Sequence, residues 1–193
     1  MPLSDGELIA RIREGSQTAF RELYERFAGR VYNTALSYVQ NVPDAEEVTQ
    51  DVFVEVHRSL HAFEQKSSLS TWVYRIAVNK SLDRLRSKAR TKRFAFVTHL
   101  FDPESNQQRF DQTDFVHPGV RLEQKETAAA LFKAIGALPE NQKTAFILTR
   151  VEQLSQAETA SVMNIGIKAL ESLLQRAKEN LKKKLEDFYK SGN

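Results

Sequence analysis

The chain has 193 residues, a formal net charge of +3, 41% hydrophobic residues, 27% charged residues and no cysteine. This length allows one ordinary domain or two small ones, and the composition is globular rather than disordered. The lack of cysteine excludes disulfide frameworks, thiol nucleophiles and cysteine-ligated zinc. The sequence has no apolar run of membrane-spanning length and no secretory signal at the N-terminus, so we expect a cytoplasmic protein.

Residues 1–90 have the pattern of a helical bundle with about four helices and short connections. Ser4 and Glu7 form a capping-box pattern that opens a short helix, and Gly15 ends it. Ser16 can cap a long amphipathic helix, whose apolar face we expect to pack in the core. That face comprises Phe20, Tyr24, Phe27, Val31 and Tyr38, with Leu23 and Leu36 beside it.

The stretch Asp44–Phe63 has the period of a helix with two different stripes. Asn41-Val42-Pro43 breaks the preceding helix, and Asp44 can cap this one. Its apolar stripe is Val48, Val52, Val56 and Leu60, and its acidic stripe is Glu47, Asp51 and Glu55. We expect exposed carboxylates along one side, which suit a basic protein partner.

The polar stretch EQKSSLS predicts a loop, and Ser70 can cap the helix that follows it. One face of that helix holds Trp72, Arg75, Asn79, Asp83 and Arg86. Between Lys80 and Arg93 there are seven lysines or arginines and one acid. Such a localised basic segment indicates a nucleic-acid partner.

These two blocks, DAEEVTQDVF and SSLSTWVYRIAVNKSLDRLR, resemble region 2 of the sigma-70 family in order and spacing. The short chain resembles the extracytoplasmic-function (ECF) sigma factors of bacteria. The resemblance implies that the acidic helix contacts the β′ clamp helices of RNA polymerase core. Its candidate contacts are Asp44, Glu47, Gln50, Asp51 and Glu55.

The SSLSTW block resembles the part of the family that opens the minus-ten promoter element, where unpaired bases need a pocket and a stacking surface. The candidate minus-ten contacts are Ser67, Ser68, Ser70, Trp72, Arg75, Asn79, Lys80, Asp83 and Arg86. For Trp72 a place in the core is the stronger alternative. Lys88, Arg90, Lys92 and Arg93 are expected to meet phosphates without reading sequence.

The helical pattern dissolves from Thr91 to about Glu123, so residues 92–121 are interpreted as an interdomain linker. Its five phenylalanines, which are unusual for a free tether, are candidates for docking on a domain or partner. Residues 122–193 then predict a second helical domain, with one helix ended by Pro139 and another over ENQKTAFILTRVEQL. Within it, Ser155 and Glu158 form another capping box.

The rest of the second domain has the pattern of a helix-turn-helix. Asn164-Ile165-Gly166 is a tight turn, Ala160 is small where two helices cross, and a last helix starts near Ile167. ALPENQKTAFILTRVEQLSQAETASVMNIGIKALESLLQRAKENL resembles sigma region 4, which reads the minus-thirty-five element and touches the polymerase β flap. The resemblance departs from the family pattern at Glu171 and Leu173. The candidate contacts are Lys168, Ala169, Glu171, Ser172, Gln175 and Arg176.

The sequence therefore predicts an all-α protein of two small domains, 1–91 and 122–193, joined by a linker. The resemblance implies a sigma factor that recognises promoters and melts DNA, with an anti-sigma protein as a further partner. We expect no active site, metal or cofactor. The main alternative is a conventional helix-turn-helix regulator with a helical sensor domain. A metal enzyme is another alternative, because His57 and His61 lie one helical turn apart beside Glu64, but the spacing places no third ligand. The second domain alone is also compatible with a helical interaction domain that does not touch DNA.

Overall fold

The computed structural model describes residues 3–101 and 125–191 of the chain, and over these residues the regular structure is entirely helical. This confirms the predicted all-α class. No helix within these two ranges is long and apolar enough to cross a membrane. The first module consists of α1 (Asp5–Arg13), α2 (Gln17–Val39), α3 (Val42–Ser59), the short η1 (Leu60–Ala62) and α4 (Leu69–Phe101). The second module consists of α5 (Lys125–Gly136), α6 (Glu140–Phe146), the π-helical turn η3 (Ile147–Val151), α7 (Gln156–Met163) and α8 (Ile167–Ser191).

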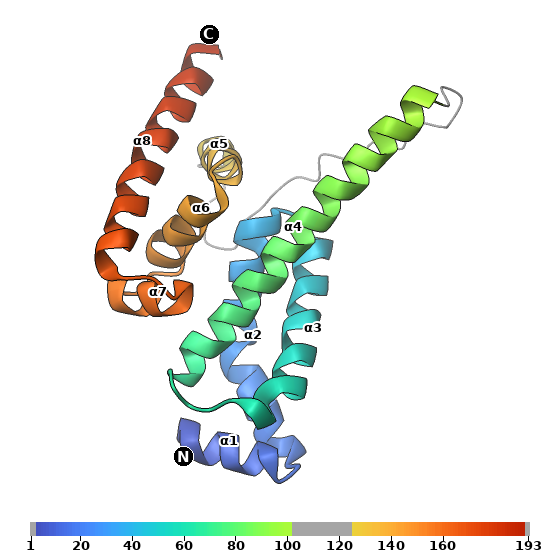
Figure 1. The fold of residues 1–193 in the computed structure, drawn as a ribbon, viewed down its shortest axis with the longest axis vertical. Helices are drawn as coiled ribbons and strands as arrows, with labels where there is room; N and C mark the ends of the chain where they lie inside the picture. The colour runs from blue at the N-terminus through green and yellow to red at the C-terminus, as the bar shows by residue number, and fades with distance from the viewer. Residues whose placement is uncertain (1–2, 102–124, 192–193) are drawn as a thin grey trace.

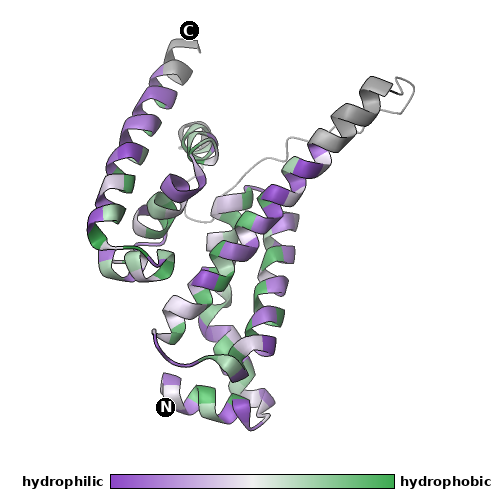
Figure 2. Ribbon diagram, in the orientation of Figure 1, coloured by the Kyte–Doolittle hydropathy of each residue, from purple (hydrophilic) through white to green (hydrophobic). Residues whose placement is uncertain are grey.

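The first module is a bundle of α2, α3 and α4, with α1 lying across its base (Figure 1). Its helices turn their apolar residues towards one another and their polar residues outward (Figure 2). The core contains most of the predicted apolar positions, including Leu23, Phe27, Val31, Val48, Val52, Val56 and Leu60. The prediction that Tyr24 packs in the core was wrong, because 46% of its surface is exposed.

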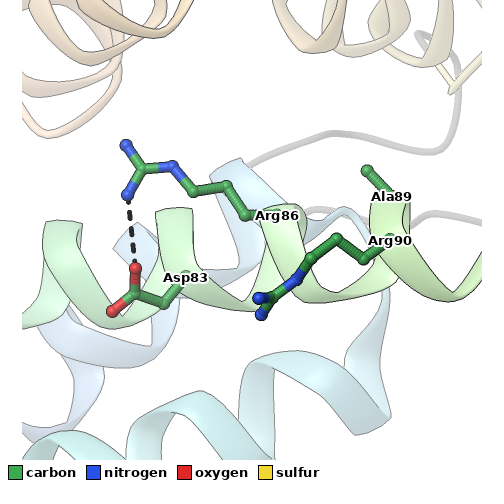
Figure 3. Close-up of a pocket in the computed structure, with 4 residues that line it drawn as sticks. All are labelled: Asp83, Arg86, Ala89 and Arg90. Atoms are coloured by element: carbon green, nitrogen blue, oxygen red, sulfur yellow. Dashed lines mark hydrogen bonds and ion pairs between the residues drawn. The ribbon is translucent and has the colours of Figure 1, made fainter.

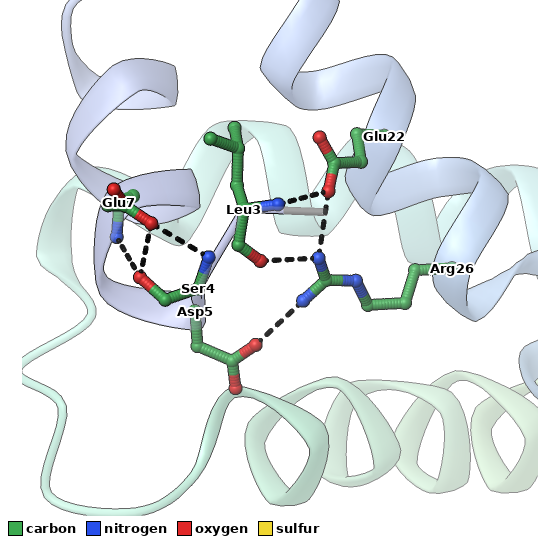
Figure 4. Close-up of polar contacts among 6 residues, drawn as sticks. All are labelled: Leu3, Ser4, Asp5, Glu7, Glu22 and Arg26. Atoms are coloured by element: carbon green, nitrogen blue, oxygen red, sulfur yellow. Dashed lines mark hydrogen bonds and ion pairs between the residues drawn. The ribbon is translucent and has the colours of Figure 1, made fainter. Parts of the chain in front are cut away.

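The start of the chain is fixed by a predicted cap and by contacts that the sequence did not indicate (Figure 4). The capping box of Ser4 and Glu7 is present, and Gly15 adopts a left-handed φ of 86° that ends the first helix. Arg26 on α2 forms ion pairs with Asp5 and Glu22, both at 2.9 Å. The pair with Asp5 joins α1 to α2, while Glu22 lies on α2 itself.

Two predicted helix caps are corrected by the structure. Asn41, not Asp44, caps α3, since its side chain accepts a hydrogen bond from the Asp44 amide at 3.0 Å. Ser68, not Ser70, caps α4, since its hydroxyl accepts a hydrogen bond from the Thr71 amide at 3.1 Å. In both cases a residue that satisfies the orphan amides stands two or three positions earlier in the sequence.

α4 is longer than expected. It runs to Phe101, whereas the sequence pattern predicts the end of the helix near Thr91. No proline or glycine lies between Leu69 and Pro103, so nothing in the backbone stops the helix there. The predicted linker therefore overlaps α4 over residues 92–101, and its remainder up to residue 121 lies outside the described residues.

The second module follows the predicted order of helices, with different ends. α5 ends at Gly136 rather than at Pro139, and the next helix passes into the π-helical turn η3 after Phe146. The capping box of Ser155 and Glu158 is present at the start of α7. In the predicted turn only Asn164 is left-handed, with a φ of 53°.

The two modules are packed against each other. A single apolar cluster includes Tyr38, Tyr74 and Val78 from the first module and Phe132 and Ile135 from the second. The side-chain amide of Gln40 on α2 also donates to the carbonyl of Phe132 at 2.6 Å. The sequence pattern indicated two tethered neighbours, and nothing in it predicted this shared interior.

Candidate nucleic-acid interface

A ladder of opposite charges joins α3 to α4. Lys80 lies 3.4 Å from Glu55, and Arg84 lies 2.8 Å from Asp44 and 2.6 Å from Glu47. Lys88 also pairs with Asp44. The basic residues recur every fourth position, so one side of α4 faces the acidic side of α3 along its length.

Asp44 and Glu55 therefore form ion pairs with basic residues of α4. Burial raises the pKa of Asp44, but the hydrogen bonds from Lys88 and Arg84 outweigh it and hold that pKa below its usual value. The pKa of Glu55 is lowered chiefly by Arg58, with Lys80 contributing. The expectation that both carboxylates are freely exposed is corrected, because Asp44 is buried and Glu55 is half-buried.

The outer side of α3 keeps exposed polar groups next to an apolar hollow. Glu47, Gln50 and Asp51 are exposed. Val54, which is 68% exposed, lies beside them and outside the predicted apolar stripe. The hollow is lined by Phe20, Tyr24, Gln50, Phe53, Val54 and His57. The sequence predicted the polar residues of this surface but not its apolar part. The available signal was Val54, a valine that lies outside the apolar stripe of the helix.

In the predicted minus-ten loop, the serines and the tryptophan have different surroundings. Ser68 is exposed while capping α4, and Ser67 and Ser70 are half-buried. Trp72 packs against the core and stacks on Phe63, with ring centroids 4.7 Å apart. The alternative of a core tryptophan is thus the arrangement in this structure.

The remaining minus-ten candidates lie on the face of α4 that contacts the second module. Arg75 donates hydrogen bonds to main-chain carbonyls of α7, and Arg86 pairs with Glu140 of α6 at 2.6 Å. Asn79 is exposed between them. Arg86 also pairs with Asp83 at 3.3 Å and, with Arg90, lines a hollow on this face (Figure 3). Lys80 differs from the others, since it turns towards Glu55. Of the expected phosphate contacts, Lys88, Arg90 and Lys92 are exposed, and the side chain of Arg93 lies outside the described residues.

All of the predicted minus-thirty-five residues are exposed in the first turns of α8: Lys168, Ala169, Glu171, Ser172, Gln175 and Arg176. Arg176 donates to the Ser172 hydroxyl at 2.9 Å, which positions its guanidinium along the helix surface. Leu173 packs against the cluster of Ala145, Ala160 and Leu170. This contact explains the apolar residue at a position where the family pattern favours a basic one, and it confirms Ala160 as a close-packing site.

His57, the first residue of the metal alternative, has a packing role: its ring meets Phe20 edge-on at 5.1 Å between centroids. Within the described part of the chain there is no group of three or more histidines and acids that could hold a metal ion.

The fold thus combines a helical bundle bearing a basic helix with a helix-turn-helix module, the class of protein expected to bind DNA and a protein partner. Comparison with known families agrees with it: residues 23–91 match sigma-70 region 2 and residues 128–181 match sigma-70 region 4. The chain belongs to the sigma-70 family and is an RNA polymerase sigma factor of the ECF kind.

Similar proteins support this assignment over nearly the whole chain. The ECF sigma factor SigW of Bacillus subtilis is 26% identical, with 93% of this chain and 96% of SigW covered. The sigma-H factor of Pseudomonas aeruginosa is 29% identical, with 94% of each covered. Among solved structures, CnrH in complex with the cytosolic domain of CnrY has a TM-score of 0.66 at 24% identity, with 95% of this chain and 97% of that chain covered. The sigma factor RpoE in complex with the anti-sigma factor NepR, from Bartonella quintana, has a TM-score of 0.65 at 21% identity, with 86% and 96% covered.

Proposed function

We propose that this sigma factor brings bacterial RNA polymerase core to promoters and opens the minus-ten element with the Ser67–Ser68 loop and the face of α4 that holds Asn79. The observation that supports this most is the alignment of Arg75, Asn79 and Arg86 on one helix face that starts at the loop. Arginines can follow a phosphate backbone, and an exposed amide can read a base edge. Ser70 and Trp72 then support the loop from behind, and Asp83 orients Arg86.

The outer side of α3 is the proposed contact for the polymerase clamp. Glu47, Gln50 and Asp51 surround the exposed Val54, so an apolar centre has a polar, acidic rim. Such a rim steers a basic partner, while the apolar centre supplies the desolvated contact. The sequence also predicts Asp44 and Glu55 as clamp contacts. Because α4 pairs with both, we assign them to the packing of α3 against α4 instead.

The start of α8 is the proposed reader of the minus-thirty-five element, with Lys168, Ser172 and Arg176 as its polar contacts. The second module would also meet the polymerase β flap. The chain itself supplies no catalytic group in this scheme: polymerase performs the chemistry, and the factor acts in the cytoplasm where polymerase is. Since a similar structure holds the anti-sigma factor NepR and another holds the cytosolic domain of CnrY, we also propose an anti-sigma protein for this factor.

Promoter binding with and without polymerase tests this proposal. We expect purified chain to give run-off transcripts from fragments of the host genome only when core is added, and not to bind promoter duplex stably alone. A conventional helix-turn-helix regulator would bind its duplex site without core. Stable, sequence-specific duplex binding by the chain alone, with no transcripts in the presence of core, would favour that regulator instead.

A further inference from the structure

The exposed side of α8 carries a carboxylate at the place where this helix is proposed to read DNA. α8 lies in the second module, on the side away from α4 (Figure 1). It buries Leu170, Ala177 and Leu181, and it leaves Glu171 and Gln175 exposed outside that buried face. Phosphates repel a carboxylate, so Glu171 lowers the general attraction of α8 for a duplex. An acid at this position therefore needs a specific reason.

Packing does not supply that reason. Two residues of α8 depart from the family pattern of basic residues, and one of them, Leu173, packs against the apolar cluster around Leu170. Glu171 has no such role, because its side chain is exposed. Within the described residues it also forms no ion pair, although Lys168 lies one helical turn before it. The structure thus explains the leucine and leaves the glutamate available to a group outside the chain.

The polar side chains that follow Glu171 on the exposed side of α8 have other partners. Gln175, four residues further on, donates from its Nε2 to Glu179 at 2.8 Å rather than to Glu171. Arg176 donates to the carbonyl and to the hydroxyl of Ser172 at 3.2 and 2.9 Å. Neither neighbour therefore neutralises the Glu171 carboxylate, whose oxygens remain able to accept hydrogen bonds from DNA.

The chemistry of the major groove limits which base can satisfy this carboxylate. An ionised carboxylate only accepts hydrogen bonds. The base atoms that donate in the major groove are the N4 amino group of cytosine and the N6 amino group of adenine, whereas guanine and thymine present acceptors. Adenine also places its N7 acceptor beside N6, where it repels a carboxylate, and cytosine has no acceptor on that edge. Cytosine is therefore the base that suits Glu171 best.

We propose that Glu171 determines promoter specificity by accepting a hydrogen bond from a cytosine of the element that α8 reads. The inference rests on the proposed function, and it adds the base that one residue selects. A guanine or thymine at that position would bring an acceptor against the carboxylate and leave both groups unsatisfied, so such promoters are rejected. Glu171 thus increases the discrimination between promoters while it weakens the attraction to DNA in general.

Selection of promoters by the complete holoenzyme tests this inference. Core polymerase with the full-length chain is incubated with a pool of randomised double-stranded DNA, and the bound duplexes are sequenced. We expect the unaltered protein to enrich a motif whose upstream part contains a preferred cytosine. Glu171→Gln should change that one preference to adenine, because an amide pairs with N6 and N7 of adenine, and Glu171→Arg should change it to guanine. The preferences at the other positions should stay the same.

A matched control and a binding measurement make the test quantitative. Glu186→Gln removes the same charge from an exposed acid further along α8, where it pairs with Lys182, and it should keep the cytosine. On the enriched promoter, replacing that cytosine by thymine should weaken binding of the unaltered holoenzyme about 5- to 150-fold, the range of one good base contact. For Glu171→Gln the same replacement should change binding by less than about 2-fold. Circular dichroism should be unchanged in these variants, since all the altered residues are exposed.

The outcomes separate this inference from the proposed function. If Glu171→Gln strengthens binding to all promoters alike and changes no base preference, Glu171 only repels phosphates, and the inference is overturned while the proposed function stands. The same conclusion follows if the position that the Glu171 variants alter is not a cytosine for the unaltered protein. If the unaltered holoenzyme enriches no motif at all, the proposed function fails and this inference fails with it.

Discussion

At the scale of single residues, Asp44 joins two helices rather than facing solvent. It is a buried carboxylate that pairs with Arg84 and Lys88 on α4. We expect Asp44→Asn to lower the free energy of unfolding by about 1–2 kcal/mol, less than a fully buried pair loses, because both cations reach solvent. Urea denaturation at neutral pH measures this. Glu25→Gln, at an exposed pair, should change stability by under about 0.5 kcal/mol. Equal effects would mean that Asp44 does not fasten α3 to α4.

The pH dependence of the same residue has a definite sign. Because the pKa of Asp44 in the folded protein lies below its ordinary value of 3.8, the ionised pair stabilises the fold above that value. The stabilisation is lost as pH falls through the folded pKa. The difference in unfolding free energy between Asp44→Asn and the unaltered protein should therefore become smaller in strong acid, where both side chains are uncharged.

Asn79 is the residue-scale test of promoter reading. It is exposed on α4 between two arginines and has the amide that can bond a base edge. Asn79→Ala should reduce open-complex formation by an amount that depends on the minus-ten sequence, about 1–3 kcal/mol if its amide makes a good base contact. Permanganate footprinting over a panel of minus-ten variants measures it. Arg90→Ala is the control and should weaken all promoters alike, since a phosphate contact has no sequence preference. A uniform loss for Asn79→Ala would assign it to the backbone instead.

At the scale of helices, the outer side of α3 is expected to meet polymerase. Asp51→Lys reverses one exposed charge at the rim of the hollow around Val54. We expect slower association with core and unchanged helicity, because rim charges act mainly on the association rate. Surface plasmon resonance with immobilised core and circular dichroism measure the two quantities. Glu25→Lys, a charge reversal on α2, should leave the association rate nearly unchanged, and a similar decrease for both variants would point to net charge alone.

The contact of η3 with α2 adds a pH-dependent element. Burial raises the pKa of Glu152, at the end of η3, to about 7, although Thr34 and Arg30 on α2 oppose the shift. Tyr74 on α4 faces the same carboxyl and is neutral, with a pKa raised by burial to about 12. Between pH 4.5 and about 7, Glu152 is thus protonated in the folded protein, whereas its carboxyl is ionised in the unfolded chain. The raised pKa of Glu152 stabilises the fold fully below pH 4.5, and this stabilisation is lost as the pH rises through about 7.

Glu152→Gln should remove this dependence. The glutamine cannot ionise, so the variant should gain stability over the unaltered protein as pH rises from about 5 to about 8, with no gain at the acidic end. Urea midpoints across that range measure the difference. Glu186→Gln, an exposed acid on α8, should run parallel to the unaltered protein. A constant offset for Glu152→Gln at every pH would show that its carboxyl does not titrate in this window.

The elements also show what the sequence could and could not predict. Local signals were sufficient for the caps of α1 and α7, since Ser4 and Ser155 satisfy amides within their own turn. The exposure of the first turns of α8 was predictable from helical periodicity alone, whereas their role at the minus-thirty-five element stays a prediction. The roles of Asp44 and Arg75 were not, because their partners lie at least 40 residues away in the chain and depend on how helices pack. Helical periodicity places a residue on a face, and it does not say which other helix covers that face.

At the scale of the whole molecule, the shared apolar cluster should make the modules interdependent. It joins Tyr38 of α2 and Tyr74 of α4 to Phe132 of α5, all of them buried. Apolar packing of this kind is less sensitive to salt than the arginine pairs nearby. The packing of the two modules against each other should therefore persist at moderate ionic strength even where the pair of Arg86 and Glu140 is screened.

Phe132→Ala tests that interdependence. Removing a buried phenylalanine ring costs on the order of 3 kcal/mol in a core, and here the missing ring faces the other module. We expect faster hydrogen exchange around Tyr38 and Tyr74 in the first module as well as in α5, because the weakened packing frees both sides. Leu170→Ala is the control: it empties a buried site whose cluster, with Ala145 and Ala160, lies wholly in the second module. That variant should exchange faster around α6 to α8 and leave α2 and α4 protected. If Phe132→Ala also leaves the first module fully protected, the modules do not support each other in solution.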